Sequence, residues 1–379
     1  MPAIRRAAVA GSFYPAAAAE LQRQIDATLR SARTAAIAPV PKALIVPHAG
    51  YIYSGPIAAA GYARLAPARE RITRVVLLGP SHFVGFRGLA ANSADGWQTP
   101  LGMVPIDRPV VDRLIEARLI GVLDAAHARE HSLEVQIPFL QKVLGEFSLV
   151  PIVAGDASPE AVTAVLDTLW GGSETLIVIS TDLSHHLDYR SCKEIDLRTA
   201  DAIERFDTSA LGSDSACGRV PIRGLLVAAK RRGMSITRLD LRNSGDTAGP
   251  RDRVVGYGSW ALFEPPRCEP REDFADREEA LNAAGPTLIE LARASIVSGL
   301  TTGCPNPVAI TPDMPAILAA PGAAFVTLRR GGQLRGCVGS SIPQRPLITV
   351  VADNAFAAAF KDPRFRLCGA TNSTISTCR

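Results

Sequence analysis

ALIVP at residues 43–47 and VVLLGP at residues 75–80 decide the fold, because each is a short aliphatic run that ends at a turn residue. The same pattern recurs as SLVPIVAG at 148–155 and TLIVIS at 175–180. Runs of this kind are typical of strands that are buried on both faces of a sheet. The segments between them are amphipathic or rich in alanine, and they predict helices at 56–68, 107–119, 132–146 and 158–170.

This alternation predicts an α/β fold, in which a mostly parallel central sheet carries helices on both faces. A last strand, VVGYGSWALF at 254–263, is expected to close a first domain over residues 1–264. The stretch 265–278 is rich in proline and charge, which is typical of a linker.

A small, incomplete α+β domain is predicted to follow at 279–368. Its expected elements are a helix at 279–297, strands at 324–330 and 334–339 around a turn at Gly331-Gly332, and a helix near 346–360. Residues 369–379 are polar and aperiodic, so we expect this aberrant tail to add nothing to a core.

Composition narrows the class of protein. A chain of 379 residues favours two domains, and 47% hydrophobic residues argue against disorder. Lys and Arg number 41 against 37 Asp and Glu, with no long basic block, so we expect neither a nucleic acid nor a membrane surface as partner. No apolar run reaches the roughly 18–20 residues of a membrane span. Seven cysteines without a C-x-x-C pair indicate neither a disulfide framework nor a zinc ribbon, and we expect a cytoplasmic protein.

The histidines point to a functional site. His48, His82 and the pair His185/His186 each follow a predicted strand. In an open parallel sheet, ligands bind beyond the carboxyl ends of the strands, where successive loops converge. Histidines delivered by three strand ends therefore predict one shared site for a metal or for acid/base chemistry.

Asp182 and His185 are three residues apart, so on a helical turn they would share one face. A carboxylate beside an imidazole orients the ring and raises its basicity, as a general base requires. The equally weighted alternative is that Asp182 caps the next helix.

Cys217 lies just before a predicted helix and near Arg219 and Arg223, which should lower its pKa and produce a thiolate. With two imidazoles, a thiolate would give an open three-ligand site for iron, copper or zinc. The alternative is a small buried apolar residue. Further candidates for the wall of a substrate pocket are Tyr51, Tyr53, His131, Glu134 and Arg219, and Glu130 could line the same wall beside His131 and Glu134.

Six motifs together resemble one known family, the Memo family, over about residues 4–264. They are AGSFYP (10–15), PHAGYIYSG (47–55), GPSHFV (79–84), EHSLEVQIPFL (130–140), STDLSHH (180–186) and ACGRVPI (216–222). Microbial members of this family are called AmmeMemoRadiSam system protein B. The resemblance implies a fold similar to that of class III extradiol dioxygenases, which are non-haem iron enzymes that open catechol rings with dioxygen.

The resemblance also implies roles for single residues. His48 and His82 match the metal-binding histidines, and Cys217 stands where the dioxygenases have a carboxylate. His185 matches their acid/base histidine, with Asp182 beside it. Because a cysteine replaces the carboxylate, ring cleavage does not carry over, and iron- or copper-dependent redox chemistry is implied instead.

The second region resembles the AMMECR domain, AmmeMemoRadiSam system protein A, through LRGCVG (334–339) and NAFAAAFKDPRF (354–365). Cys337 lies in the signature turn of that family. The resemblance covers about residues 279–367. The family continues with further strands after DPRF, so the domain looks truncated there. A fusion of the two types implies a radical-SAM protein as partner. This chain has no C-x-x-x-C-x-x-C motif of its own.

Three functions follow as hypotheses. The first is an Fe(II)- or copper-dependent oxidoreductase that acts on a small organic substrate with dioxygen, with His185 as proton shuttle. The second is a metal carrier or scaffold without turnover that works with the radical-SAM partner. The third is a metal-dependent hydrolase, compatible with zinc, in which His185 activates a metal-bound water.

Overall fold

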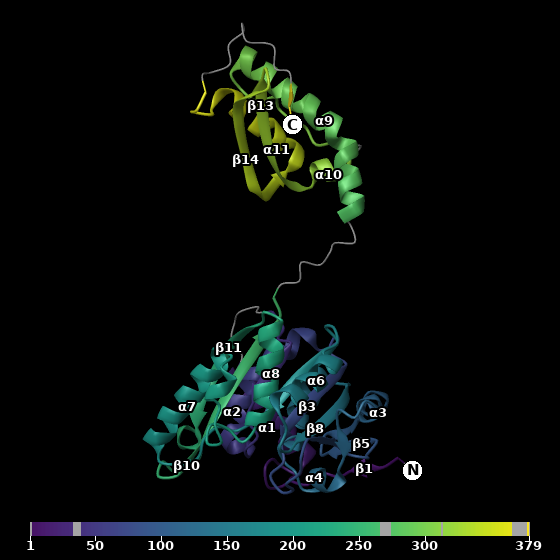
Figure 1. The fold of residues 1–379 in the computed structure, drawn as a ribbon, viewed down its shortest axis with the longest axis vertical. Coiled ribbons are helices and arrows are strands. Elements are labelled where there is room, and N and C mark those ends of the chain that lie inside the picture. Colours follow the sequence, from purple (N-terminus) through teal and green to yellow (C-terminus); the bar gives the residue numbers. More distant parts are fainter. Residues whose placement is uncertain (1, 33–38, 266–273, 312–313, 366–376, 379) are drawn as a thin grey trace. The chain divides into compact units, whose positions relative to one another are not determined.

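The computed structural model describes residues 2–32, 39–265, 274–311, 314–365 and 377–378 (Figure 1). The chain divides into two compact units, Met1–Pro266 and Arg267–Arg379, which are described separately below. Within the described ranges, no helix is both long enough and apolar enough to cross a membrane.

Four parallel strands form the middle of the main sheet in the first unit. In spatial order they are β2 (Ala43–Val46), β9 (Thr175–Ser180), β3 (Arg74–Pro80) and β8 (Ser148–Ala154). Almost every residue in them is buried, as their aliphatic sequences predict. The predicted α/β fold with a mostly parallel sheet is therefore confirmed.

Mostly antiparallel strands extend this sheet at both edges. β12 (Val254–Phe263) pairs with β2, and β10 (His185–Leu187) and β11 (Ser235–Asn243) pair with β12. At the opposite edge, β4 (Leu89–Ala91) runs antiparallel to β8, and β7 (Gly121–Val122) runs parallel to β4. A separate small sheet is formed by β1 (Ile4–Arg5), β5 (Gly96–Thr99) and β6 (Gly102–Pro105).

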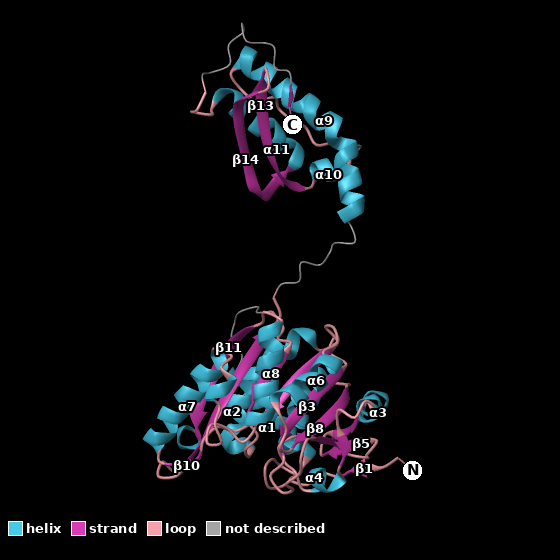
Figure 2. Ribbon diagram, in the orientation of Figure 1, coloured by secondary structure: helices cyan, strands magenta, loops and turns pink. Residues whose placement is uncertain are grey.

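Helices cover both faces of the main sheet (Figure 2). The strand order explains this arrangement. The connections from β2 through α2 (Tyr51–Tyr62) to β3, and from β3 through α5 (Ile137–Leu144) to β8, cross the sheet in one direction. The connection from β8 through α6 (Pro159–Leu169) to β9 crosses it in the opposite direction. Because such crossovers are right-handed, α2 and α5 lie on one face and α6 on the other. The helices of this unit are α1 (Ala18–Ala32), α2 (Tyr51–Tyr62), α3 (Arg108–Glu116), α4 (Asp124–Ala128), α5 (Ile137–Leu144), α6 (Pro159–Leu169), α7 (Tyr189–Glu204) and α8 (Arg219–Arg231).

The second unit is a small sheet packed against helices. β13 (Pro321–Arg330) and β14 (Gln333–Pro346) form a hairpin, and Gly331 and Gly332 turn it with φ values of 56° and 81°. A two-residue hairpin turn of this type needs positive φ at both positions, so the paired glycines produce the predicted turn. The helices are α9 (Phe274–Thr302), α10 (Ala316–Ala319) and α11 (Leu347–Phe360).

Several boundaries in the second unit differ from the sequence-based expectation: α9 ends at Thr302, β13 begins at Pro321 and β14 ends at Pro346. α9 begins at Phe274, inside the stretch expected to be a linker, because the residues that follow the prolines are good helix formers. Most of the predicted polar tail lies outside the described residues. Its Thr377 and Cys378 form β15, which pairs with β13.

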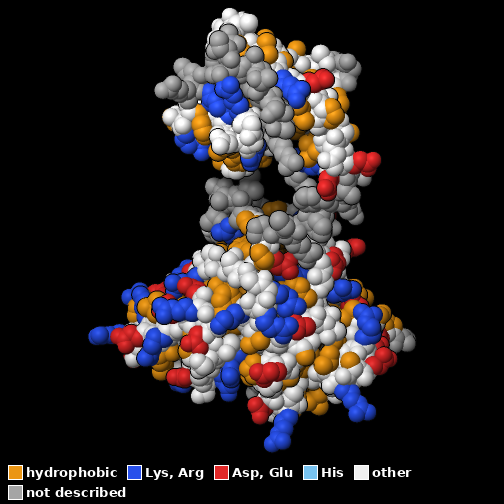
Figure 3. Space-filling model, turned by 45° about the horizontal axis from the view of Figure 1, so that its top comes forward, with side chains coloured by type: hydrophobic (Ala, Val, Ile, Leu, Met, Phe, Trp, Pro, Cys, Tyr) orange, Lys and Arg blue, Asp and Glu red, His pale blue; other side chains and the backbone are white. Residues whose placement is uncertain are grey.

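Charged side chains of both signs are mixed on one face of the first unit. On the face of that unit drawn in Figure 3, Lys and Arg side chains are interspersed with Asp and Glu, and among its described residues they do not gather into one basic patch.

Candidate metal centre

Three histidine rings meet beyond the carboxyl ends of β2 and β3. His48 follows β2 by two residues, His82 follows β3 by two, and His131 lies between α4 and the 3₁₀ turn Glu134–Gln136. Their ring centroids are 5.2 Å (His48–His82), 5.4 Å (His48–His131) and 4.5 Å (His82–His131) apart. One ligand atom from each ring lies within 4.8 Å of those of the other two, so the group could hold a metal ion.

A hydroxyl at the end of β9 orients the ring of His48. Ser180 Oγ donates to the Ser132 carbonyl at 2.5 Å and accepts from Gln136 Nε2 at 2.8 Å. Because the hydroxyl proton is already used, His48 Nδ1, at 2.9 Å from Ser180 Oγ, must be the donor to it. The Nε2 atom of His48 therefore keeps its lone pair, as a metal ligand requires.

A buried carboxylate joins the loops of His82 and His131. Glu130 Oε1 accepts from His82 Nδ1 and from the backbone N–H groups of His131 and Ser132, all at 2.9 Å. Its Oε2 accepts from the backbone N–H of His82 at 2.6 Å. Burial alone would raise the pKa of Glu130, but the hydrogen bonds and charge of His82 outweigh it, and the pKa falls to about 2. The carboxylate thus stays ionised, and because it occupies Nδ1 of His82, Nε2 is the ring atom that could bind a metal.

The environment keeps two of the imidazoles neutral. Burial lowers the pKa of His48 well below its ordinary value, and the neighbouring His82, His131 and His185 add to the effect. Burial, together with His82, lowers the pKa of His131 to about 4. Neutral imidazole is the form that binds a metal, so this donor set fits a divalent transition metal at neutral pH.

Cys217 lies beside this group but is not a member of it. Its Sγ is 3.3 Å from His48 Nε2 and accepts from the backbone N–H of Asp182 at 3.2 Å. The tight approach of the two loops depends on Gly218, where a Cβ would lie 2.6 Å from the Cβ of Thr181. In the part of the chain that the structure describes, one group of possible metal ligands has all its ligand atoms within 4.8 Å of one another, and it consists of the three histidines alone.

The predicted low pKa of Cys217 is wrong. Burial raises its pKa to about 12, and the nearby Asp182 carboxyl adds to the rise. The proximity of Arg219 and of the start of α8 does not offset the loss of water around the sulfur. The thiol is therefore neutral in the metal-free protein.

Asp182 and His185 do not share a helical face, so the predicted orienting pair is wrong. Residues 181–184 are not helical, and His185 is exposed on β10. Asp182 is buried and accepts instead from the backbone N–H of His48 at 2.7 Å, and burial raises its pKa to about 7. The alternative role as a helix cap is also wrong, because Asp188 caps α7. Asp182 positions the His48 loop.

The predicted pocket residues have different places in the structure. Tyr51 is buried and donates to the Val135 carbonyl at 2.7 Å, and Glu134 accepts from Arg5, Tyr14 and two backbone N–H groups of the N-terminal segment. Both therefore support the site without lining it. His131 belongs to the histidine group itself, and Tyr53 is half-buried. Arg219 lines a cavity of about 690 Å³ that also contains Cys217.

Of the residues that hold the site together, the sequence analysis missed Ser180 and placed Glu130 only in the wall of the site, without its bonds to both histidine loops. Each had a readable signal. Glu130 directly precedes a histidine, and Ser180 is the polar residue that ends the apolar run of β9.

Comparison with known proteins identifies the first unit. The family model described as Memo-like protein matches residues 5–261. The chain belongs to the Memo family. A second model, described as AMMECR1, matches residues 289–372, so the expected Memo–AMMECR pairing is confirmed. The metal-binding roles predicted for His48, His82 and Cys217, and the acid/base role predicted for His185, stay predictions.

Relatives agree with this assignment, and two solved structures are also similar to parts of the chain. Proteins described as MEMO1 family proteins from Saccharolobus solfataricus and Aquifex aeolicus are 35% and 36% identical to the chain, and each match covers 67% of this chain and 97% of the relative. An uncharacterised protein from Pyrococcus horikoshii is 34% identical over 23% of this chain and 44% of its own, with a TM-score of 0.21. One from Escherichia coli K12 is 15% identical over 58% of this chain and 99% of its own, with a TM-score of 0.40.

Proposed function

We propose that the Memo domain is a metal-dependent oxidoreductase, which holds Fe(II) or copper through His48, His82 and His131 and oxidises a small organic substrate with dioxygen. The observation that carries the proposal is the convergence of three imidazoles beside a thiol that lines a cavity. Bound iron or copper would supply the redox chemistry that side chains lack. Imidazole suits both metals, and a neighbouring sulfur favours them over harder cations.

The chain's own residues prepare the site for this chemistry. Ser180 and Glu130 fix the two Nδ1–H groups of His48 and His82, so the rings need no reorganisation before they bind. The rings of Phe13 and Phe83 lie 4.6 Å and 6.0 Å from that of His131 and shield it from water. In the proposal, His185 accepts a proton from the substrate at its imidazole nitrogen.

The donor set also supports a second candidate, metal-dependent hydrolysis. Three imidazoles with an open position are the ligand set of some catalytic zinc sites. This activity would persist with zinc and would need no oxygen, which separates it from the first candidate.

The test begins with the full chain stripped of metal by a chelator and reloaded anaerobically with Fe(II), Cu(II) or Zn(II). Elemental analysis is expected to give about one metal per chain, and His48→Ala, His82→Ala and His131→Ala are each expected to lose it. His186→Ala is the matched control, because His186 is an exposed histidine outside the group. Metal content unchanged in all three variants would refute the site.

Turnover is tested separately in an oxygen electrode with phenols and thiols as candidate substrates. Oxygen uptake with iron or copper but not zinc supports the oxidoreductase. Tight metal binding without uptake favours the metal carrier. We further propose a radical-SAM protein as partner, which co-purification from the native host would test.

A further inference from the structure

A second, unassigned feature adjoins the metal centre. A cavity of about 690 Å³ opens beside Cys217, between the loop after β3, the loop after β8 and the first turn of α8. Two arginines from different segments line it, Arg87 from the first loop and Arg219 from the helix. Asp156 is the only acidic residue among its described lining residues.

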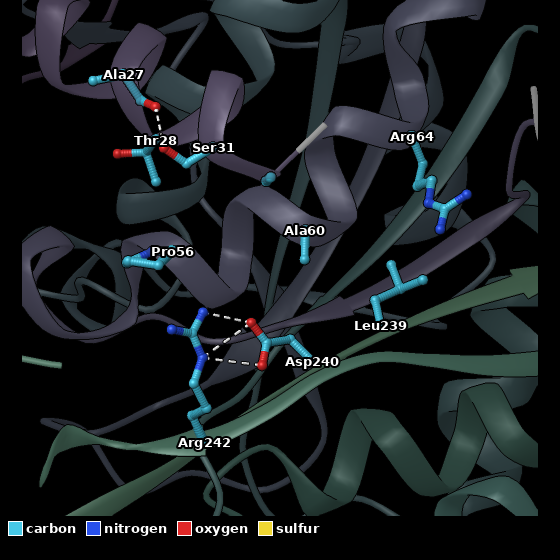
Figure 4. A pocket seen from close by; sticks show the side chains of 10 residues that line it. Ala27, Thr28, Ser31, Pro56, Ala60, Arg64, Leu239, Asp240 and Arg242 are labelled. Atoms are coloured by element: carbon cyan, nitrogen blue, oxygen red, sulfur yellow. Dashed lines mark hydrogen bonds and ion pairs between the residues drawn. The ribbon is translucent and has the colours of Figure 1, made fainter. Parts of the chain in front are cut away.

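Neither guanidinium is neutralised by a residue that the structure describes. Among the described residues, Arg87 and Arg219 have no ion pair and no side-chain hydrogen bond, although Asp156 lines the same cavity. The cavity of about 510 Å³ between α1, α2 and β11 is different. There Asp240 accepts three hydrogen bonds from Arg242, at 3.0, 3.1 and 2.5 Å (Figure 4). Two unpaired guanidiniums in one hollow leave donors for a ligand.

Apolar side chains form part of the cavity wall. Val84 and Phe86 line it from the loop after β3, and Ala216 and Val220 line it on either side of Cys217. A cavity of this kind suits a ligand with an organic body and one or two charged groups. A fully hydrated inorganic ion would leave the apolar wall unused.

We propose that this cavity binds the acidic group of a small organic molecule, a carboxylate or a phosphate monoester, through Arg87 and Arg219. The proposal deepens the proposed function, on which it rests for the identity of this molecule as the substrate. Guanidinium groups present paired N–H donors that match the two oxygens of a carboxylate or phosphate. The organic body would then lie on the apolar wall beside Cys217, whose Sγ is 3.3 Å from His48 Nε2.

The experiment measures binding to the metal-free full chain, so that its result does not depend on the metal. The probes are benzoate and phenyl phosphate, with benzamide as the neutral counterpart and inorganic phosphate as the ion without an organic body. Titration calorimetry or ligand-observed NMR is expected to show binding of one or both organic anions that weakens as salt is added. Comparison of the affinities for benzoate and phenyl phosphate tells whether the cavity prefers a carboxylate or a phosphate.

The variants assign the binding to the cavity. Arg219→Ala is expected to weaken binding about tenfold or more, and the more exposed Arg87→Ala about three- to tenfold. Arg219→Lys keeps the charge but loses the paired donors, so an intermediate loss is expected. Arg64→Ala is the matched control, because Arg64 lines the other cavity, and it should leave the affinity within about twofold.

Three outcomes would overturn the proposal: no binding of either organic anion at about 10 mM, equal losses in Arg64→Ala and Arg219→Ala, or benzamide binding as tightly as benzoate. None of these outcomes depends on the metal content that is measured to test the proposed function. A failure of the anion site and a failure of the metal centre are therefore distinguishable.

Discussion

Glu130→Gln is expected to weaken both the fold and the metal centre, because one carboxylate accepts hydrogen bonds from the loops of two of the three histidines. A glutamine keeps one oxygen for the three donors at Oε1 and sets an NH₂ group against the backbone N–H of His82. One buried donor is then unsatisfied, which costs about 1–3 kcal/mol, and three bonds lose their charged acceptor.

The pKa of Glu130 gives a second estimate of how much the carboxylate stabilises the folded protein. The hydrogen bonds and charge of His82 outweigh burial and hold the pKa at about 2, below the ordinary 4.5. At about 1.4 kcal/mol per pH unit, the difference corresponds to about 3 kcal/mol in favour of the folded protein. Because the folded pKa is the lower one, this stabilisation is present above pH 4.5 and is lost as the pH falls toward 2. The loss of stability that Glu130→Gln causes should therefore become smaller over the same pH range.

The assay is guanidinium denaturation followed by tryptophan fluorescence. Trp97, Trp170 and Trp260, the three tryptophans of the chain, all lie in the first unit, so the signal reports that unit alone. We expect a loss of about 3 kcal/mol at pH 7 and a loss of metal affinity of roughly ten- to a hundredfold.

Glu134→Gln is the matched control. Glu134 is also a buried carboxylate, but it binds Arg5, Tyr14 and the N-terminal segment and contacts none of the three rings through a hydrogen bond. It should lower stability and leave metal affinity nearly unchanged. If the two variants lose equal metal affinity, Glu130 does not position the histidines and the reasoning fails.

Three further predictions concern the same edge of the sheet. Ser180→Ala leaves Nδ1 of His48 without its acceptor, and competition titration with a chromophoric chelator should show metal affinity reduced by roughly tenfold or more. Gly218→Ala places a Cβ 2.8 Å from the Ser180 carbonyl oxygen, and denaturation should show a loss of about 1–3 kcal/mol. Finally, burial holds the pKa of His131 at about 4, so the unfolded chain binds its proton first as the pH falls. Stability of the metal-free protein should therefore drop between about pH 6.5 and pH 4, and His131→Gln should flatten part of that drop.

The core of the fold could be predicted because its strands are buried on both faces. Such strands read as unbroken aliphatic runs, so β2, β3, β8 and β9 are visible in the sequence without their neighbours. The order β2–β9–β3–β8 was not predicted, since pairing depends on contacts between distant segments. β11 was not predicted either, because an edge strand such as SITRLDLRN exposes polar residues along much of its length.

Only the site residues that directly follow a buried strand could be predicted from the sequence. His48 and His82 end parallel neighbours of β9, so the sheet brings them together. His131 comes from a segment that no strand precedes, and its place depends on the buried Glu130, whose partners are not apparent from sequence. The Asp182–His185 prediction failed because it assumed a helical turn at these residues, whereas α7 begins only after Asp188.

The protonation of Cys217 decides how much the sulfur contributes to metal binding. Burial and the nearby Asp182 raise its pKa to about 12, so releasing the proton at pH 7 costs about 7 kcal/mol before any metal–sulfur bond forms. The imidazoles of His48 and His131 carry no such cost, since burial already keeps them neutral. Cys217→Ser should therefore reduce metal affinity less than His131→Ala does. Metal titrations at pH 7 and pH 9 check this, because a ligating thiolate would make the affinity of the unaltered protein, but not of Cys217→Ser, rise with pH. A larger loss in Cys217→Ser than in His131→Ala would show that the sulfur is a primary ligand.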